Sequence, residues 1–421
     1  MGSTLATAVA IDGSGNAVLV GSISGTADFG GGVLTTSGAT DIFITKVNAA
    51  GKHVWSKLLA NPQAESLAAA AIDPTGNILV AGDFDGVIFT DTDKLTSVGG
   101  GDVLVAKLDP AGFVLWAKGY GDAQYQHATG IAADGSGNAF VTGEFEGSID
   151  LGGGPLGSEG KADVFLTKLD PTGGHLWSKR FGDNADQYAA AVAVNAAGNV
   201  AVTGSFQGAV DFGSGSLNST AIDIYLAKFD SSGTPAWSKR FGTSGYNAGT
   251  SLAMDNAGNT VLTGTFFGAV DFGNGVLTTA GDSDIFVAKF DPSGATLWSK
   301  HFGDASGKYG SRGKSIAVDP AGDVIVTGTF EGTIDLGGGP LISSGERDYF
   351  IVKLDPSGNY LWSTRFGNNA DQTEVTVAAY DSTNVLLTGR LSGSIDFGGG
   401  PLANTSTVGA SDTFLAKLLT P

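Results

Sequence analysis

The six tryptophans of this 421-residue chain recur at a nearly constant spacing along the sequence. The intervals of 61, 61, 60, 61 and 64 residues separate Trp55, Trp116, Trp177, Trp237, Trp298 and Trp362. A second marker keeps the same step and comprises Asn16, Asn77, Asn138, Asn199, Asn259, Asp323 and Asn384. A unit of about 60 residues is therefore written seven times, which indicates a repeat architecture.

One unit, residues 188–241, contains four short runs of β-forming residues separated by turn signals. The first run alternates small and larger residues, as expected for strands crowded near an axis. Its small positions are Ala8, Ala69, Gly130, Ala191, Ser251, Ser315 and Val377. The third run is apolar on both faces, which is typical of a strand covered on both sides. Asp-x-x-Gly turns follow the first and third runs and favour tight hairpins.

A sheet of four such strands has two apolar faces that it cannot bury alone, whereas a ring of sheets buries both. We therefore predict an all-β fold, a seven-bladed β-propeller with four-stranded antiparallel blades. An open β-solenoid is the alternative, although its ends would need capping repeats. No linker or composition shift interrupts the repeats, so residues 1–421 are predicted to form a single domain. The expected blades are residues 4–61, 62–122, 123–183, 184–243, 244–304, 305–368 and 369–421.

The tryptophans are best explained by packing between neighbouring blades, and the lysines that recur in the strands by solvation or ion pairing. The net charge of −19 argues against nucleic acid as a partner, because phosphate binding requires clustered Lys and Arg. The absence of cysteine excludes disulfides and thiolate chemistry. No apolar run approaches the ~20 residues of a membrane span. We expect no cofactor.

Three motifs resemble the bacterial SBBP repeat, named after the seven-bladed β-propeller. They are Gly-Asn-x-x-Val-Thr-Gly at 198–204, Asp-x-Phe-x-x-Lys-Leu-Asp at 163–170 and Trp-Ser-Lys-Arg-Phe-Gly at 177–182. The resemblance covers nearly the whole chain. It implies a secreted or cell-envelope protein of bacteria and implies no catalytic residues. The chain opens on a strand pattern rather than on a signal peptide, so an exported protein would have its leader outside these residues.

Departures from the repeat indicate where a ligand could bind. Length changes fall in the loops between the fourth run and the next first run, and between the second and third runs. In a four-stranded meander these loops share one rim, and loops on a rigid scaffold often bind ligands. Aromatic and polar residues there predict a site for a glycan or a protein. The candidate residues are Tyr125, His127, Tyr188, Tyr246, Tyr309 and Arg312.

The seventh unit has no tryptophan run, so its blade is expected to lack the outermost strand. Its third run, which contains Phe414, Leu415 and Lys417, would then lie at the edge of the blade. Its sequence is nevertheless that of a strand covered on both sides, so the edge would be poorly protected against pairing. We expect this edge to pair with a strand of a partner, of another copy, or of a part of the natural protein that lies outside these residues. A polymerising structural protein is accordingly an alternative function.

An enzyme is not expected. The four histidines form no motif, and no HExxH, P-loop, GxSxG or CxxC pattern occurs. Paired carboxylates leave a carbohydrate-active enzyme as a remaining alternative. Six loop aspartates recur before glycines, but one carboxylate each is too few for calcium, so we interpret them as turn caps and expect no metal. These aspartates are Asp28, Asp150, Asp211, Asp271, Asp335 and Asp396. A non-enzymatic binding or structural propeller fits best.

Overall fold

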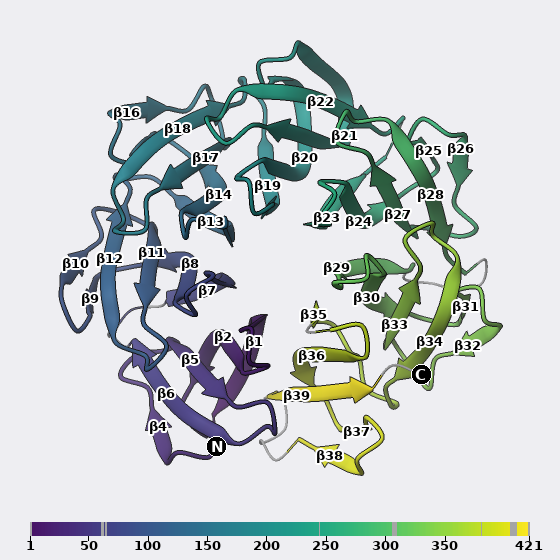
Figure 1. Cartoon of the computed structure of the whole chain (residues 1–421), viewed down its shortest axis with the longest axis horizontal. Helices are drawn as coiled ribbons and strands as arrows, with labels where there is room; N and C mark the ends of the chain where they lie inside the picture. The colour runs from purple at the N-terminus through teal and green to yellow at the C-terminus, as the bar shows by residue number, and fades with distance from the viewer. Residues whose placement is uncertain are drawn as a thin grey trace.

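The computed structural model describes residues 2–59, 63, 65–243, 245–304, 310–379, 381–404 and 411–419. This part of the chain forms β-strands and no helix. Seven antiparallel sheets follow one another around a central axis and form a ring (Figure 1). The predicted all-β, seven-bladed propeller is therefore confirmed, and the open solenoid is wrong.

Six blades have four strands, and the chain moves outward from the innermost strand to the outermost. Blade 1 contains β1 (Ser3–Ile11), β2 (Ala17–Ser24), β5 (Asp41–Val47) and β6 (His53–Leu59). Blade 2 contains β7 (Glu65–Ile72), β8 (Ile78–Phe84), β11 (Asp102–Leu108) and β12 (Val114–Tyr120). Blade 3 contains β13 (Gln126–Ala133), β14 (Ala139–Phe145), β17 (Asp163–Leu169) and β18 (His175–Phe181). Blade 4 contains β19 (Gln187–Val194), β20 (Val200–Asp211), β21 (Ser216–Phe229) and β22 (Pro235–Phe241).

The remaining blades follow the same order. Blade 5 contains β23 (Ala248–Met254), β24 (Thr260–Phe266), β27 (Asp284–Phe290) and β28 (Thr296–Phe302). Blade 6 contains β29 (Arg312–Val318), β30 (Val324–Phe330), β33 (Asp348–Leu354) and β34 (Tyr360–Phe366). Blade 7 has three strands within the described residues, β35 (Val375–Ala379), β36 (Asn384–Leu391) and β39 (Asp412–Leu419), with β39 at the edge. The expected loss of its outermost strand is confirmed.

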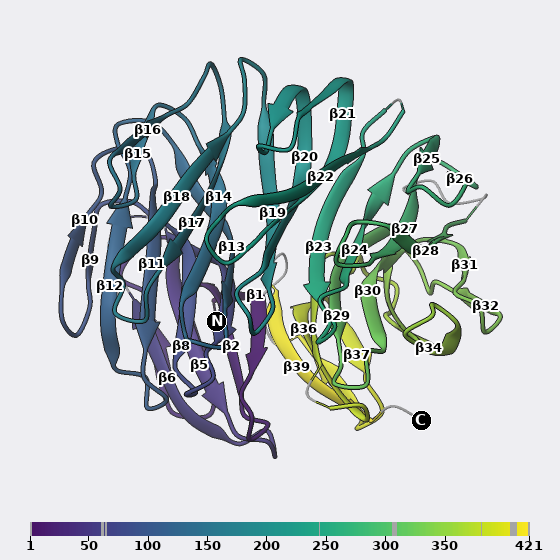
Figure 2. The same cartoon turned by 45° about the horizontal axis from the view of Figure 1, so that its top comes forward.

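Each blade also has a hairpin between its second and third strands, which the sequence did not predict. Six are separate two-stranded sheets, and in blade 4 the hairpin is a continuation of β20 and β21. The hairpins lie outside the blades, as β9–β10 and β31–β32 show at opposite edges of Figures 1 and 2. They are β3 (Thr26–Asp28) with β4 (Val33–Thr35), β9 (Val87–Phe89) with β10 (Lys94–Thr96), β15 (Ser148–Asp150) with β16 (Pro155–Gly157), β25 (Ala269–Asp271) with β26 (Val276–Thr278), β31 (Thr333–Asp335) with β32 (Pro340–Ile342), and β37 (Ser394–Asp396) with β38 (Pro401–Ala403).

The recurring loop aspartates cap these hairpins, as expected. The Asp28 Oδ1 accepts hydrogen bonds from the backbone N–H of Gly30 and of Gly32, at 2.8 and 3.0 Å. The equivalent bonds form at Asp150, Asp211, Asp271, Asp335 and Asp396. These carboxylates thus satisfy backbone donors of tight turns.

The ring closes between blade 7 and blade 1. The Thr4 N–H donates to the Ser411 carbonyl at 2.9 Å, and the Thr413 N–H donates to the Thr4 Oγ1 at 2.8 Å. A buried cluster that includes Ala6, Leu19 and Leu386 crosses the same boundary. Apolar packing and hydrogen bonds therefore join strands about 400 residues apart in the sequence.

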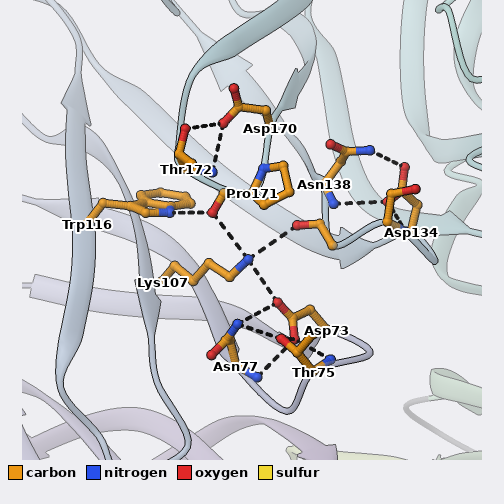
Figure 3. Close-up of polar contacts among 12 residues, drawn as sticks. Asp73, Thr75, Asn77, Lys107, Trp116, Asp134, Asn138, Asp170, Pro171 and Thr172 are labelled. Carbon is orange, nitrogen blue, oxygen red and sulfur yellow. Dashed lines mark hydrogen bonds and ion pairs between the residues drawn. The ribbon is translucent and has the colours of Figure 1, made fainter.

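A buried lysine and a tryptophan join each of blades 1 to 5 to the next blade, as Figure 3 shows for blades 2 and 3. The Lys107 Nζ lies 2.8 Å from the Asp73 Oδ2 of its own blade. It also donates to the carbonyls of Gly137 and Pro171 of blade 3, both at 3.3 Å. The Trp116 Nε1 donates to the same Pro171 carbonyl at 3.1 Å. We call this arrangement the inter-blade clamp.

The inter-blade clamp recurs around the ring. Tryptophan Nε1 atoms of blades 1 to 5 donate to a turn carbonyl of the next blade at 3.0–3.3 Å. Ion pairs between a strand lysine and a turn aspartate join Lys46 to Asp12, Lys107 to Asp73, Lys168 to Asp134, Lys289 to Asp255, and Lys353 to Asp319. Packing between blades is thus confirmed as the role of these five tryptophans, although only Trp116 and Trp298 are nearly buried, at 9% exposed.

We predict that Trp116→Ala lowers the free energy of unfolding by about 3–5 kcal/mol, because it removes a nearly buried indole. The indole hydrogen bond to blade 3 is lost as well. Leu115→Ala is the matched control, since Leu115 is 48% exposed in the same strand. It should change stability by less than about 0.5 kcal/mol. Urea unfolding measures both, and equal losses would contradict the inter-blade clamp.

A second prediction concerns acid stability. Burial raises the pKa of Asp73, but hydrogen bonds from Lys107, Thr75 and Asn77 outweigh it and lower the pKa to about 2. The stability that ionised Asp73 contributes is therefore complete above about pH 4 and is lost as the pH falls to about 2. Urea unfolding of the wild type and of Asp73→Asn should differ most at pH 6 and converge between pH 4 and 2. A constant difference down to pH 2 would refute this assignment.

Candidate functional site

The long loops lie on one rim of the ring, as predicted. The start of β13 pairs with the end of β14, where Gln126 faces Phe145, and Phe145 in turn faces Asp163 at the start of β17. Val164 of β17 faces Phe181 at the end of β18. Strand starts and ends therefore alternate along this rim, which we call the long-loop face. The tight Asp-x-x-Gly turns, and with them the inter-blade clamps, lie at the opposite ends of the strands.

Buried glutamines hold the loops of this face in place. The Gln126 Nε2 donates to the Asp122 Oδ1 at 2.7 Å and to the Glu146 carbonyl at 3.0 Å. Gln187 makes the same pair of bonds, to Asp183 and to the carbonyl of Gln207. Both glutamines are 0% exposed. Side chains on these loops are thus presented by a fixed backbone.

Three charged residues of blades 2 and 3 form a cluster on this face, which we call the acid–histidine cluster. The His127 Nδ1 lies 2.5 Å from the Asp83 Oδ1, which also accepts a hydrogen bond from the Ser66 hydroxyl at 2.9 Å. Glu144 is the cross-strand neighbour of His127. Its Oε2 accepts a hydrogen bond from the backbone N–H of Ala189 in blade 4, at 3.2 Å. The cluster therefore spans three blades.

The environment raises the pKa values of Glu144 and His127. Burial raises the pKa of Glu144 to about 7, although the His127 charge and the Ala189 hydrogen bond oppose the shift. Burial lowers the pKa of His127, but its hydrogen bond to Asp83 and the charges of Asp83 and Glu144 outweigh this, and the net shift is upward. Glu144 therefore takes up a proton near neutral pH, and the positive form of His127 is favoured.

Tyrosines surround the acid–histidine cluster. Tyr125 stacks on His127 with ring centroids 5.9 Å apart and is 46% exposed. Burial and the charges of Asp83 and Glu144 raise its pKa to about 12. Burial, with a contribution from Glu144, also raises the pKa of Tyr188, which is 41% exposed. Glu144 thus lies near both tyrosines.

The remaining three candidate residues, Tyr246, Arg312 and Tyr309, differ in their position relative to the acid–histidine cluster. Tyr246 is 52% exposed, packs edge-on against Phe267 with centroids 6.4 Å apart, and is close enough to influence the pKa of Tyr188. Arg312 is exposed at the start of β29 in blade 6 and forms no ion pair within the described ranges. Tyr309 lies outside the described residues. The structure therefore brings together Tyr125, His127, Tyr188 and Tyr246 in successive blades and leaves Arg312 apart.

Sequence reasoning missed Asp83 and Glu144, although their positions break the repeat. Both follow the glycine near the end of the second strand. The seven residues at this position are Ser22, Asp83, Glu144, Ser205, Thr265, Thr329 and Arg390. Two carboxylates and one guanidinium among small hydroxyl residues are a departure that could have been read from the sequence.

A cavity of about 480 Å³ occupies the axis of the ring and is lined by the innermost strand of every blade. Small residues dominate its wall, including Ala8, Ala69 and Gly130, as the predicted crowding requires. Lys314 and Glu374 form an ion pair there at 3.2 Å. Within the described ranges, no three His, Asp or Glu side chains are grouped to hold a metal ion. The same residues include no helix able to span a membrane.

Two curated proteins resemble the chain in sequence. An uncharacterized WD repeat-containing protein, L264, of Acanthamoeba polyphaga mimivirus is 23% identical over 86% of this chain and 27% of its own length. The regulatory protein FlaEY of Caulobacter vibrioides is 24% identical over 78% of this chain and 36% of its own length. The chain thus spans little more than a third of these relatives at most. No protein-family model matches the chain.

Solved structures resemble the fold at low identity. A protein of unknown function from Bacteroides caccae aligns with a TM-score of 0.40 and 12% identity, over 77% of this chain and 89% of the other. Sqt1 from Chaetomium thermophilum aligns with a TM-score of 0.45 and 11% identity, over 91% and 93%. A puromycin hydrolase mutant aligns with a TM-score of 0.45 and 12% identity, over 97% and 53%.

We predict that Glu144→Gln stabilises the protein more at pH 8 than at pH 5. The pKa of Glu144 is raised to about 7 in the folded state. Its ionisation therefore destabilises the fold progressively as the pH rises from about 4.5 to about 7. Gln removes this cost and keeps an oxygen for the Ala189 N–H. The gain in unfolding free energy should be about 2–3 kcal/mol greater at pH 8.

The matched control is Glu146→Gln, at an exposed carboxylate two residues away. It should change the unfolding free energy by similar amounts at the two pH values. If Glu144→Gln behaves in the same way, the raised pKa is refuted.

Proposed function

We propose that this chain is a non-enzymatic binding propeller that holds a glycan on its long-loop face. The proposal rests on one observation: Tyr125, Tyr188 and Tyr246 stand 41–52% exposed at the entrances of three successive blades, beside the half-buried carboxylates of Asp83 and Glu144. Tyrosine rings offer an apolar face and a polar hydroxyl, which suits the two-sided character of sugar rings. Fixed loops reduce the entropy lost on binding.

A protein ligand is the other occupant that this face would accept, since exposed tyrosines are common in protein interfaces. We favour a glycan because the aromatic residues alternate with Asp83, Glu144 and His127, which can exchange hydrogen bonds with sugar hydroxyls. We place the protein at the exterior or envelope of a bacterium, in line with the resemblance to the SBBP repeat.

A carbohydrate-active enzyme is less well supported. The raised pKa of Glu144 would suit a general acid. However, Glu144 is committed through Oε2 to a backbone amide of blade 4, and Asp83 Oδ1 is committed to His127 and Ser66. These bonds hold each carboxylate through one oxygen, which suits a fixed hydrogen-bond acceptor better than a group that must transfer a proton. Binding without catalysis therefore remains our proposal.

The test is a glycan array probed with the intact protein and with a triple variant, Tyr125→Ala, Tyr188→Ala and Tyr246→Ala. Bound glycans should lose at least about tenfold in affinity, because exposed aromatic anchors dominate such contacts. Phe113→Ala is the matched control, since Phe113 is 64% exposed in a tight turn at the opposite rim. Full binding by the triple variant, or no glycan bound by the wild type, would overturn the proposal.

A further inference from the structure

The outermost strand of a complete blade packs on a turn glycine of the next blade. A Cβ atom built on that glycine would lie only 2.8–3.1 Å from the indole of the preceding blade's tryptophan. The five pairs are Gly112 with Trp55, Gly173 with Trp116, Gly233 with Trp177, Gly294 with Trp237, and Gly358 with Trp298. Five boundaries between blades are thus filled by the same contact.

The outermost strand also covers the hairpin of its own blade. The residue two positions before the tryptophan lies on the hairpin glycines in blades 1 and 3 to 6. The pairs are His53 with Gly30, His175 with Gly152, Pro235 with Gly213, Thr296 with Gly273, and Tyr360 with Gly337. Blades 1, 3, 4 and 5 therefore each use one strand to close two surfaces.

Both surfaces are open at the boundary between blade 7 and blade 1. Among the described residues, no heavy atom lies within 4 Å of a Cβ atom built on Gly51, the turn glycine of blade 1. The hairpin glycines of blade 7, Gly398 and Gly399, are equally uncovered. Lys417 is exposed, whereas its equivalents Lys107 and Lys289 are 2% exposed. Gly51 and Lys417 line the same cavity beside the edge strand β39.

The open surfaces form a groove along β39. A cavity of about 250 Å³ is lined by Leu19, Gly51, Leu386, Leu415 and other residues of blades 1 and 7. A second cavity of about 640 Å³ continues it toward Thr4 and Asp412 and shares the residues Phe29, Thr413, Phe414 and Leu415 with the first. Of the three edge residues predicted from the sequence, Phe414 is 2% exposed and packs against Phe397, while Leu415 is half-buried. The groove is therefore lined by apolar side chains beside the edge of β39, where no other strand of the described chain pairs with it and where the Thr413 N–H already donates to Thr4.

We propose that this groove binds an extended strand of a partner polypeptide whose sequence is Trp-Ser-Lys-Arg or a close equivalent. The strand would pair antiparallel with β39, as in strand addition to a sheet edge. In blade 3, Lys168 faces Trp177 and Thr167 faces Ser178. The same register places the incoming tryptophan opposite Lys417 and over Gly51.

The register also accounts for the basic residue of the partner. Arg180, Arg240 and Arg365, three positions after a tryptophan, each pair with the first aspartate of the neighbouring strand. Asp412 occupies that position in β39, although it already makes an interaction within the chain. The chain's net charge of −19 attracts a basic strand further.

A second copy of this chain fits the groove less well. Its own free edge is β39, which contains no tryptophan, and its tryptophans lie in complete blades. Pairing of two β39 strands would leave the surface over Gly51 open. The chemistry of the groove therefore favours a separate strand with an indole.

The test measures anisotropy of a dye-labelled peptide that reproduces residues 171–182, added to the intact protein. We expect saturable binding. The same peptide with Trp177→Ala should bind at least about tenfold more weakly, since the indole fills the pocket. Gly51→Asn in the protein should weaken binding similarly, because its side chain occupies the indole's position, and asparagine tolerates the φ of 75° found there.

Gly76→Asn is the matched control. Gly76 has a φ of 86° in an equivalent tight turn, and the nearest atom to its Cβ direction lies 3.6 Å away. This variant should bind the peptide as the wild type does. The triple tyrosine variant should also bind the peptide as the wild type does. This result would show that the peptide site is independent of the proposed glycan site.

Three outcomes would overturn the proposal. They are no saturable binding, equal binding of the peptide that lacks the indole, and equal binding by Gly51→Asn. Sedimentation showing a dimer that excludes the peptide would instead assign the groove to a second copy.

Discussion

The ring depends on backbone carbonyls in the tight turns. Such a carbonyl accepts hydrogen bonds from the lysine and the tryptophan of the preceding blade. The Pro171 carbonyl of blade 3 accepts both the Lys107 ammonium and the Trp116 indole of blade 2. A lysine that is 2% exposed would be costly without compensation. Its own blade supplies only the Asp73 carboxylate, so the remaining partners must come from the next blade. The buried charge therefore specifies which surfaces meet, while apolar packing supplies most of the stability.

Blade 4 shows what happens when the carboxylate is missing. Asn195 replaces the turn aspartate, and Lys228 donates to the Gly258 carbonyl of blade 5 at 2.6 Å. Burial lowers the pKa of Lys228, although Asp291 and Asp255 act in the opposite direction. The lysine is nonetheless 4% exposed, as buried as its equivalents. The carbonyls of the following blade thus keep the clamp geometry without an ion pair.

The repeat predicted most of the fold because strand order, tight turns and blade contacts are the same in every unit. The packing of Trp116 and the edge strand with Leu415 followed from their register alone, whereas the burial of Lys107 against the next blade did not. The outer hairpins were missed, since their glycine-rich segments carry turn signals that conceal three-residue strands. Asp83 and Glu144 were missed for a different reason: their partners lie in neighbouring blades, and a unit considered by itself does not show which position faces across the boundary.

The two rims of the ring tolerate sequence variation to different degrees. Both candidate sites therefore lie where the sequence departs from the repeat. At the tight-turn rim, loss of the lysine or of the indole of a clamp leaves a carbonyl of the next blade without its partner, so variation at these positions is costly. At the long-loop face, buried glutamines such as Gln126 hold the backbone from within. The adjoining position can then be Ser205, Glu144 or Arg390 without disturbing the blade. The groove beside β39 has a related origin. The inter-blade clamp requires the outermost strand with its tryptophan, and where that strand is missing, the surface that it would cover becomes a binding surface.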